Sequence, residues 1–297
     1  MRLFDGPDLH AGAESFAAHL ARLGPAPAPG KGFLETLARA GMTGRGGASF
    51  PVAVKWTAVA RNSHGRAIVL VNGAEGEPQS KKDRALMATR PHLILDGAFI
   101  AARVVHASRI VLYIGETHSA ARHAMQRALL ERPAHEQKTV SFASAPARYV
   151  AGQEGAAIHL VNEGIATPTS TPPFPFERGI DGSATLVQNV ETLAHVALIA
   201  RTGRPAGTSL VTLAGAISSP GVLEVDAGTS IGEVVARAGG PSEHPRAVLL
   251  GGYFGSWLDP GAAWNLPVDA VRLKELGLGL GCGVIGLLPA SRCPVCE

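Results

Sequence analysis

The sequence predicts an α/β fold in which a domain with a mostly parallel sheet is followed by a smaller β-rich module. Between residues 67 and 143, apolar runs typical of buried strands alternate with stretches of helical periodicity. The turn pair Asn72-Gly73 directly follows the first of these runs. After Pro205, short strand-like runs and one short helical stretch replace this alternation. Strands that alternate with helices of this length form parallel sheets covered on both faces.

Each element of the first domain has its own local signal. A short N-terminal helix is followed by a proline-rich linker over residues 24–32. Pro91 marks a helix start, because proline is favoured in the first helical turn. The expected elements are a strand at 67–71, a helix at 91–107, a strand at 109–114, a helix at 117–132, a strand at 139–143 and a helix at 189–200. The stretch 168–175 contains too many prolines for either regular element.

The smaller module is expected to contain strands at 209–214, 222–225 and 247–250 and a helix at 231–238, which ends at a glycine pair. The expected organisation is an N-terminal helix and linker over 1–29, an α/β domain over 30–205, the module over 206–260 and a glycine-rich segment over 261–297.

The composition limits the class of protein. A chain of 297 residues with 46% hydrophobic and 17% charged residues can form about two globular domains. The net charge is only +3 and the arginines are scattered, which argues against nucleic-acid binding. Apolar runs stay below the about 18 residues of a membrane span, so no membrane insertion is expected. All three cysteines lie at position 282 or later, unlike a secreted disulfide framework, and we expect a cytoplasmic protein.

The segment 41–51, Gly-Met-Thr-Gly-Arg-Gly-Gly-Ala-Ser-Phe-Pro, is the most informative part of the chain. Its glycines leave backbone N–H groups free to approach an anion, which favours a phosphate-binding loop. Lys55 can add a positive charge, and Phe50 offers a face on which an aromatic ring can stack. The spacing is not that of a dinucleotide-binding Gly-x-Gly-x-x-Gly loop, because its third glycine would fall on Ser49. The alternatives are a flexible turn and a surface role for Arg45.

Five segments occur in one order, namely the glycine loop, Asn72-Gly-Ala-Glu-Gly-Glu-Pro78, Tyr149-Val-Ala-Gly-Gln-Glu154, Pro172-Pro-Phe-Pro175 and Gln188-Asn-Val-Glu-Thr-Leu193. Together they resemble the family of FMN-binding, NADH-oxidising subunits of respiratory complex I (NADH-quinone oxidoreductase) and the related flavin subunits of NAD-reducing hydrogenase and formate dehydrogenase. The Asn-Gly-Ala-Glu form also resembles the C-type subunit of the Rnf electron-transport complex. The resemblance spans roughly residues 30–290. It implies a Rossmann-like flavin-binding domain followed by a β-grasp, soluble-ligand-binding (SLBB) domain.

The resemblance implies FMN as the cofactor and NADH as the substrate, with no catalytic side chain. No metal ligand is expected from this chain's own cysteines and histidines. Glu77 and Glu154 would position the nicotinamide nucleotide. The implied cofactor-binding residues are Gly44, Arg45, Gly46, Gly47, Phe50, Lys55, Asn72, Glu75, Glu77, Gly152, Gln153, Glu154, Phe174, Gln188 and Asn189. From the residues alone, Glu75 and Glu77 can also be solvated turn residues, and Phe174 can fill a core gap.

The implied function is electron transfer in which FMN accepts a hydride from NADH and passes single electrons to an iron–sulfur partner, a ferredoxin-like protein or subunit. The protein would act in the cytoplasm, either free or peripheral on the inner face of the membrane as part of a complex. Where the family has an aromatic residue, Asp, Glu and Lys, this chain has Ala58, Ala74, Gln153 and Thr171. The departures at Ala58 and Thr171 favour an alternative, a non-catalytic flavin- or ligand-binding assembly subunit that no longer uses NADH.

The cysteines differ from those of the family. Family members hold a four-iron cluster with four cysteines, whereas this chain has Cys282, Cys293 and Cys296. No 4Fe–4S cluster is expected from this chain alone, and the segment 261–297 is interpreted as the start of a cluster-binding domain that is missing or truncated. The Cys293-x-x-Cys296 pair can be a zinc or cluster ligand, a redox dithiol or an unpaired remnant. The eleven histidines form no metal-binding motif.

Overall fold

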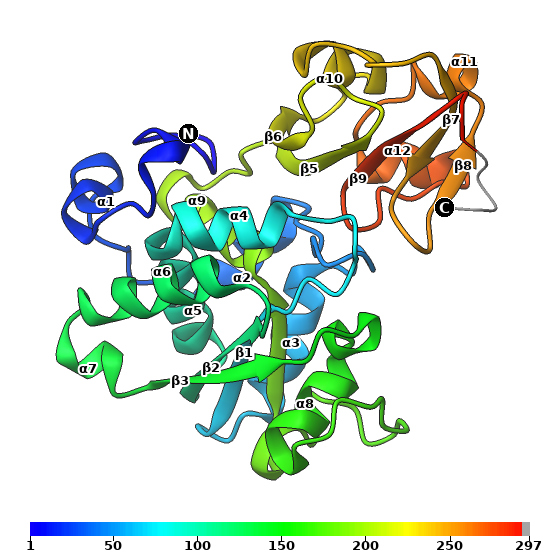
Figure 1. Ribbon diagram of the computed structural model, residues 1–297. Coiled ribbons are helices and arrows are strands. Elements are labelled where there is room, and N and C mark those ends of the chain that lie inside the picture. Colours follow the sequence, from blue (N-terminus) through cyan, green and yellow to red (C-terminus); the bar gives the residue numbers. More distant parts are fainter. Residues whose placement is uncertain (293–297) are drawn as a thin grey trace. The chain divides into compact units, whose positions relative to one another are not determined.

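The structure is a computed structural model that describes residues 1–292, and it divides into two compact units (Figure 1). The first unit consists of Met1–Gly44, Phe50–Gly76 and Asp83–Ala206. The second consists of Arg45–Ser49, Glu77–Lys82 and the chain from Gly207 onward.

The first unit is built on a parallel four-stranded sheet with the order β3-β2-β1-β4. Its strands are β1 (Ala67–Gly73), β2 (Ala107–Gly115), β3 (Val140–Ala145) and β4 (Thr185–Asn189). Strand β1 lies in the middle, and its residue Asn72 is opposite Tyr113 of β2 and Asn189 of β4. The expected α/β class with a mostly parallel sheet is confirmed.

Helices cover both faces of this sheet, which explains why β1 is apolar on both sides. Helices α5 (Pro91–Val104) and α9 (Val190–Thr202) pack against each other and against β1. On the opposite face, Leu70 of β1 belongs to a cluster with Ile158 of helix α8 (Glu154–Glu163).

The remaining helices of this unit are α1 (Phe16–Leu23), α2 (Phe33–Arg39), α3 (Val52–Asn62), α4 (Lys82–Thr89), α6 (Ser119–Leu130), α7 (Ala134–Gln137) and the 3-10 turns η1 (Leu9–Ala11), η2 (Tyr149–Gly152) and η3 (Ile180–Gly182). The expected strands and helices are present with shifted ends. Strand β4 and helices α3 and α4 were not predicted, because β4 is short and α4 begins with charged residues.

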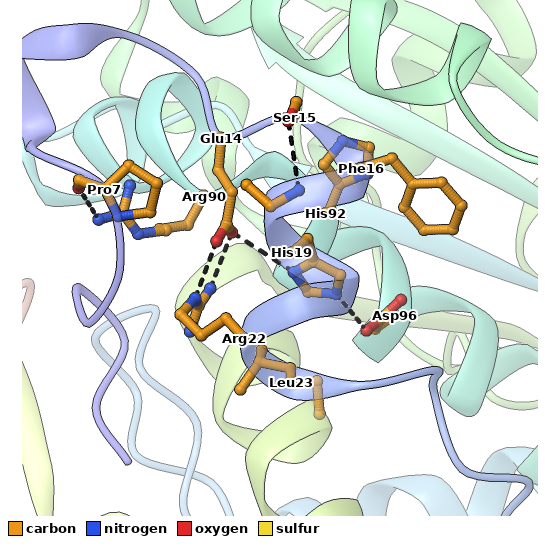
Figure 2. A network of polar contacts seen from close by, with 12 residues as sticks. Pro7, Glu14, Ser15, Phe16, His19, Arg22, Leu23, Arg90, His92 and Asp96 are labelled. Atoms are coloured by element: carbon orange, nitrogen blue, oxygen red, sulfur yellow. Dashed lines mark hydrogen bonds and ion pairs between the residues drawn. The ribbon is translucent and has the colours of Figure 1, made fainter.

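A buried polar network attaches helix α1 to helix α5 (Figure 2). The side chain of Ser15 caps α1 by accepting a hydrogen bond from the Ala18 N–H group. His19 lies between two carboxylates, with Nδ1 3.4 Å from Glu14 Oε2 and Nε2 2.8 Å from Asp96 Oδ2. Arg22 also donates to Glu14 at 2.8 Å. Opposite charges therefore pair where water is excluded.

The second unit contains a five-stranded sheet with the order β6-β5-β9-β7-β8. Its strands are β5 (Thr208–Gly215), β6 (Gly221–Asp226), β7 (Pro245–Leu250), β8 (Ser256–Leu258) and β9 (Val284–Pro289). Helices α10 (Ile231–Arg237), α11 (Pro260–Ala263) and α12 (Ala270–Glu275) accompany this sheet. Strand β9 pairs in parallel with β5 and antiparallel with β7. The sequence did not predict β9, which lies in the glycine-rich segment.

One apolar core serves the second unit, and it includes Val225, Val234, Leu273 and Ile285. The capping box of α10, in which Ser230 and Glu233 bond each other's backbone N–H groups, fixes the start of its helix. Across residues 1–292, the structure contains no helix that combines the length and the apolar character of a bilayer span.

Candidate functional site

The strand order of the first unit reverses at β1, where an open α/β sheet is expected to have its ligand crevice. From β1 the chain continues to β2 and β3 on one side, and β4 then pairs with the other side of β1. Ligands of open α/β sheets bind at such a reversal, outside the carboxyl ends of the strands. The predicted residues Asn72 and Asn189 are opposite each other at this point.

Glu75 lies in the loop after β1 and anchors the start of helix α4. Its backbone has a φ of +44°, and its carboxylate is 2% exposed. Oε1 accepts the Asp83 N–H group at 2.9 Å, while Oε2 accepts Arg84 N–H at 3.0 Å and Arg84 Nε–H at 2.9 Å. The carboxylate therefore holds the N-terminal turn of α4. Contact between Glu75 and a flavin stays a prediction.

The loop after β1 lies against the segment around η2. Asn72 Nδ2 donates to the Gly152 carbonyl at 2.8 Å. A Cβ on Gly76 would lie 2.5 Å from the Tyr149 carbonyl oxygen, so only glycine allows this approach. Tyr113 donates its hydroxyl to the Ala151 carbonyl at 3.0 Å, and burial raises the pKa of Tyr113 to about 12. The two predicted loops are therefore brought together.

Two further predicted residues lie at the start of α8. The Gln153 side chain accepts the Ala156 N–H group at 2.8 Å and caps the helix. Glu154 forms an ion pair with Lys55 of α3, with 3.1 Å between Oε2 and Nζ. The side chains of Lys55 and Glu154 are 24% and 32% exposed, so a ligand can reach both. Phe50, just before α3, is 52% exposed.

Gln188 and Asn189 end strand β4. Gln188 Oε1 accepts the indole N–H group of Trp56 at 3.0 Å. Asn189 caps α9 by accepting Glu191 and Thr192 N–H groups at 2.9 and 3.3 Å, and its Nδ2 donates to Asp83 at 2.7 Å. Both side chains are held in one orientation by buried partners.

Phe174 lies in the proline-rich segment and is 45% exposed. Its ring stacks on that of Phe176, with 5.4 Å between centroids and 5° between the ring planes. The exposed ring does not fill a core gap, which was the alternative interpretation.

In the second unit, Arg45 lies next to strand β5. Its guanidinium donates to Ser209 Oγ at 2.8 Å and to the Thr208 carbonyl at 3.4 Å. The same segment, Arg45–Ser49, contains the predicted Gly46 and Gly47. Gly47 has a φ of +109°, and a Cβ there would lie 3.5 Å from Cys282 Sγ. The segment thus has the left-handed backbone that favours glycine.

Glu77 is also in the second unit, where its carboxylate binds the turn between β7 and β8. Oε2 accepts the Tyr253 N–H group at 2.8 Å, and Glu77 is 5% exposed. A Cβ on Gly252 would lie 2.7 Å from this carboxylate. The structure thus places Glu77 in a fold-forming contact, and its role toward a nicotinamide nucleotide stays a prediction.

His118 is a buried residue of this region that the sequence interpretation missed. It follows β2, is 7% exposed, and lies so close to Gly115 that a Cβ there would be 2.6 Å from Nδ1. Burial lowers the pKa of His118, as does Arg84, whereas Glu75 and the Gly73 backbone raise it. The sequence signal that could have identified His118 is its position just after an expected strand.

Apart from the glycines, the predicted residues of the first unit fall into two groups. One group bonds backbone groups of loops and helix starts, namely Asn72, Glu75, Gln153 and Asn189. The other presents an exposed ring, a reachable charge or a side-chain amide, namely Phe50, Lys55, Glu154, Phe174 and Gln188. Stacking faces, a cation and hydrogen-bond donors are what a phosphate-bearing aromatic cofactor requires, so the second group fits FMN.

Of the three cysteines, the structure describes only Cys282. Cys282 has intermediate exposure. Cys293 and Cys296 lie outside the described residues. Within residues 1–292, no group of three or more His, Cys, Asp or Glu side chains is arranged to hold a metal ion.

Curated relatives are similar to most of this chain. An F-type subunit of NADH-quinone oxidoreductase from Rhizobium meliloti is 30% identical over 88% of this chain and 68% of its own length. The F-type subunit of NADH-quinone oxidoreductase from Salmonella typhimurium is 33% identical over 82% of this chain and 60% of its own. A chain in the crystal structure of an NAD+-reducing [NiFe]-hydrogenase in the H2-reduced state superposes with a TM-score of 0.78 and 29% identity, over 93% of this chain and 52% of that one.

The chain thus spans about half to two thirds of the length of these proteins. Two family descriptions also match. The Nuo51 FMN-binding domain matches residues 37–198, and the SLBB domain matches residues 210–252. The first match includes the whole parallel sheet of the first unit, and the second lies in the second unit. The chain therefore belongs to the Nuo51 FMN-binding domain family and contains an SLBB domain.

Proposed function

We propose that this protein binds FMN, takes electrons from NADH and passes them to an iron–sulfur partner. The observation that carries this proposal is the reversal of strand order between β1 and β4, which lies inside the family match and has residues suited to a flavin nucleotide at its carboxyl end. Bound FMN supplies the chemistry, because it accepts two electrons as a hydride and releases them one at a time.

The side chains would bind and orient the two nucleotides. Lys55 supplies a cation for a phosphate, and Gln188 supplies an amide for the polar part of the cofactor. Phe50 and Phe174 offer exposed rings for stacking. Glu154 can accept ribose hydroxyl groups of the dinucleotide once its ion pair with Lys55 gives way to the ligand. Holding the nicotinamide against the flavin can contribute about 7–11 kcal/mol to lowering the barrier.

The partner is proposed to be an iron–sulfur protein or subunit. The similar proteins are named as a subunit of NADH-quinone oxidoreductase and as an NAD+-reducing hydrogenase, which supports membership in a multisubunit complex. We propose a cytoplasmic location, peripheral on the inner face of the membrane if the complex is membrane-bound.

A second candidate is a flavin- or ligand-binding assembly subunit that no longer uses NADH. Two side chains next to the predicted nicotinamide position favour it. Gln153 is occupied as a helix cap, and the Glu154 carboxylate is bound to Lys55. Neither is then free to accept a ribose hydroxyl group without rearrangement.

An anaerobic titration of the purified protein separates the two. The electron-transfer protein binds added FMN, turns yellow and loses its yellow colour on addition of NADH. A yellow protein that NADH does not bleach is the assembly subunit or uses another donor. A protein that cannot take up FMN contradicts both the cofactor and the redox function.

A further inference from the structure

We propose that Trp56 is a positioning residue that fixes the side-chain amide of Gln188 so that its NH2 group, and not its oxygen, faces the predicted cofactor. The site then offers a hydrogen-bond donor at the end of β4, and the ligand must supply an acceptor there. This inference rests on the proposed FMN-binding function and deepens it.

The first argument is the direction of the hydrogen bond between the two side chains. Trp56 Nε1 lies 3.0 Å from Gln188 Oε1, in a contact closed to solvent. An indole N–H group can only donate, and an amide offers either an oxygen that accepts or an NH2 group that donates. Because two donors cannot bond each other, the amide oxygen must face the indole. The chemistry of the pair therefore assigns the amide orientation.

The second argument is the rigidity of the partner. Trp56 is fully buried in helix α3, which packs against strands β1 and β4. Gln188 is 5% exposed and sits in β4 in register with Val71 of β1. A rotation of the amide would leave the buried indole N–H group without its acceptor, so the orientation is costly to reverse.

The third argument is the position of the other end of the amide. A Cβ on Gly44 would lie 4.0 Å from Gln188 Nε2, so this nitrogen faces Gly44 of the predicted phosphate-binding loop. Within residues 1–292, Nε2 has no protein hydrogen-bond acceptor. A phosphate, hydroxyl or carbonyl oxygen of the cofactor can accept from it.

The test compares FMN affinities, measured by quenching of flavin fluorescence, for the wild type, Q188M and Q188E. Q188M removes both polar groups at similar length. Q188E keeps an oxygen for Trp56 and replaces the NH2 group by a second acceptor. Measurements in 1 M salt, where the Debye length is about 3 Å, limit long-range repulsion from the phosphate. We expect Q188M to bind FMN about three- to tenfold more weakly and Q188E to bind no better than Q188M.

Q188E binding as tightly as the wild type, or more tightly, overturns the donor assignment. The role of Trp56 is tested by W56F, which keeps an aromatic side chain of smaller size and removes the N–H group. We expect W56F to weaken FMN binding about two- to fivefold and W56F/Q188M to match Q188M alone, because Trp56 acts through Gln188. If the factors by which W56F and Q188M weaken FMN binding multiply in the double variant, the positioning role of Trp56 is wrong. W257F, at a half-exposed tryptophan of the second unit, is the control and should bind FMN normally.

A measurement without flavin separates this inference from the proposed function. The indole N–H resonance of Trp56 in ¹⁵N-labelled protein should shift upfield in Q188M and stay near its wild-type position in Q188E. If the wild type binds no FMN, the proposed function is wrong. If the Trp56 indole N–H resonance does not shift in Q188M, the Trp56–Gln188 interaction itself is contradicted.

Discussion

His19 Nε2 lies 2.8 Å from Asp96 Oδ2, and both side chains are 1% exposed (Figure 2). This contact joins helix α1 to helix α5 in the first unit. Arg132 and Arg201 also pair with Asp96. Burial raises the pKa of Asp96, but the hydrogen bond with His19 and the nearby positive charges outweigh burial and hold this pKa well below its usual value. This network therefore connects the N-terminal segment to α5, and we expect protonation of its carboxylates to lower stability in acid.

Protonation of Glu14 in acid should lower the free energy of unfolding. Burial raises the pKa of Glu14, but hydrogen bonds from His19 and Arg22 lower it to about 2, from an ordinary value of 4.5. A lowered carboxyl pKa stabilises the fold above the unfolded value, and this contribution is lost as the pH falls from about 4.5 to 2. At about 1.4 kcal/mol per unit, up to about 3 kcal/mol is involved. Urea unfolding at several pH values should show E14Q with a flatter profile in this window than the wild type.

Protonation of His92 should lower the stability of the fold at a higher pH than protonation of Glu14 does. Burial, Arg132 and His19 lower the pKa of His92 to about 4, from 6.5. The folded state therefore prefers the neutral ring, and stability falls as the pH decreases from about 6.5 to 4 because the unfolded chain gains the proton first. NMR titration of the His92 ring should give an apparent pKa near 4. The variant H10Q, at an exposed histidine, should leave this part of the stability profile unchanged, and a ring that titrates near 6.5 would contradict the prediction.

The sequence predicted the parts of the fold whose signals are local. Strands β1 and β2 appeared as continuous apolar runs, and α5 began at Pro91 as expected. Strand β9 was missed because glycines surround it, and its pairing with β5 depends on residues about 70 positions apart. A strand partner so far away in the chain leaves no pattern in the sequence around β9.

The functional site, too, was predicted where its signals are local in the sequence. The five motifs led to the family that the matches confirm, and the strand order brings Asn72 and Asn189 together. The contact between Trp56 and Gln188 and the burial of His118 beside the loop after β1 were not predicted, because they arise from packing between distant segments. The cofactor contacts of the individual residues stay predictions.

Removing the Glu75 carboxylate should loosen the loop after β1. In E75A, the Asp83 and Arg84 N–H groups lose their acceptor at the start of α4, which should lower the free energy of unfolding by about 1–3 kcal/mol. We expect weaker FMN binding as well, since the same loop borders the crevice. Urea unfolding and flavin fluorescence measure the two effects. E163A, at an exposed glutamate, is the control, and equal stability of E75A and E163A would refute the anchoring role.

Glycine at position 76 should be required for the approach of the loop after β1 to the η2 segment. In G76A, the new Cβ would lie 2.5 Å from the Tyr149 carbonyl oxygen, a backbone atom that cannot move alone. The two segments must separate, which should lower the free energy of unfolding by about 1–3 kcal/mol and weaken FMN binding. G30A, where no atom lies within 4 Å of the added Cβ, should behave as the wild type in both measurements. If G76A retained wild-type stability and FMN affinity, the close approach of these segments would not be what shapes the crevice.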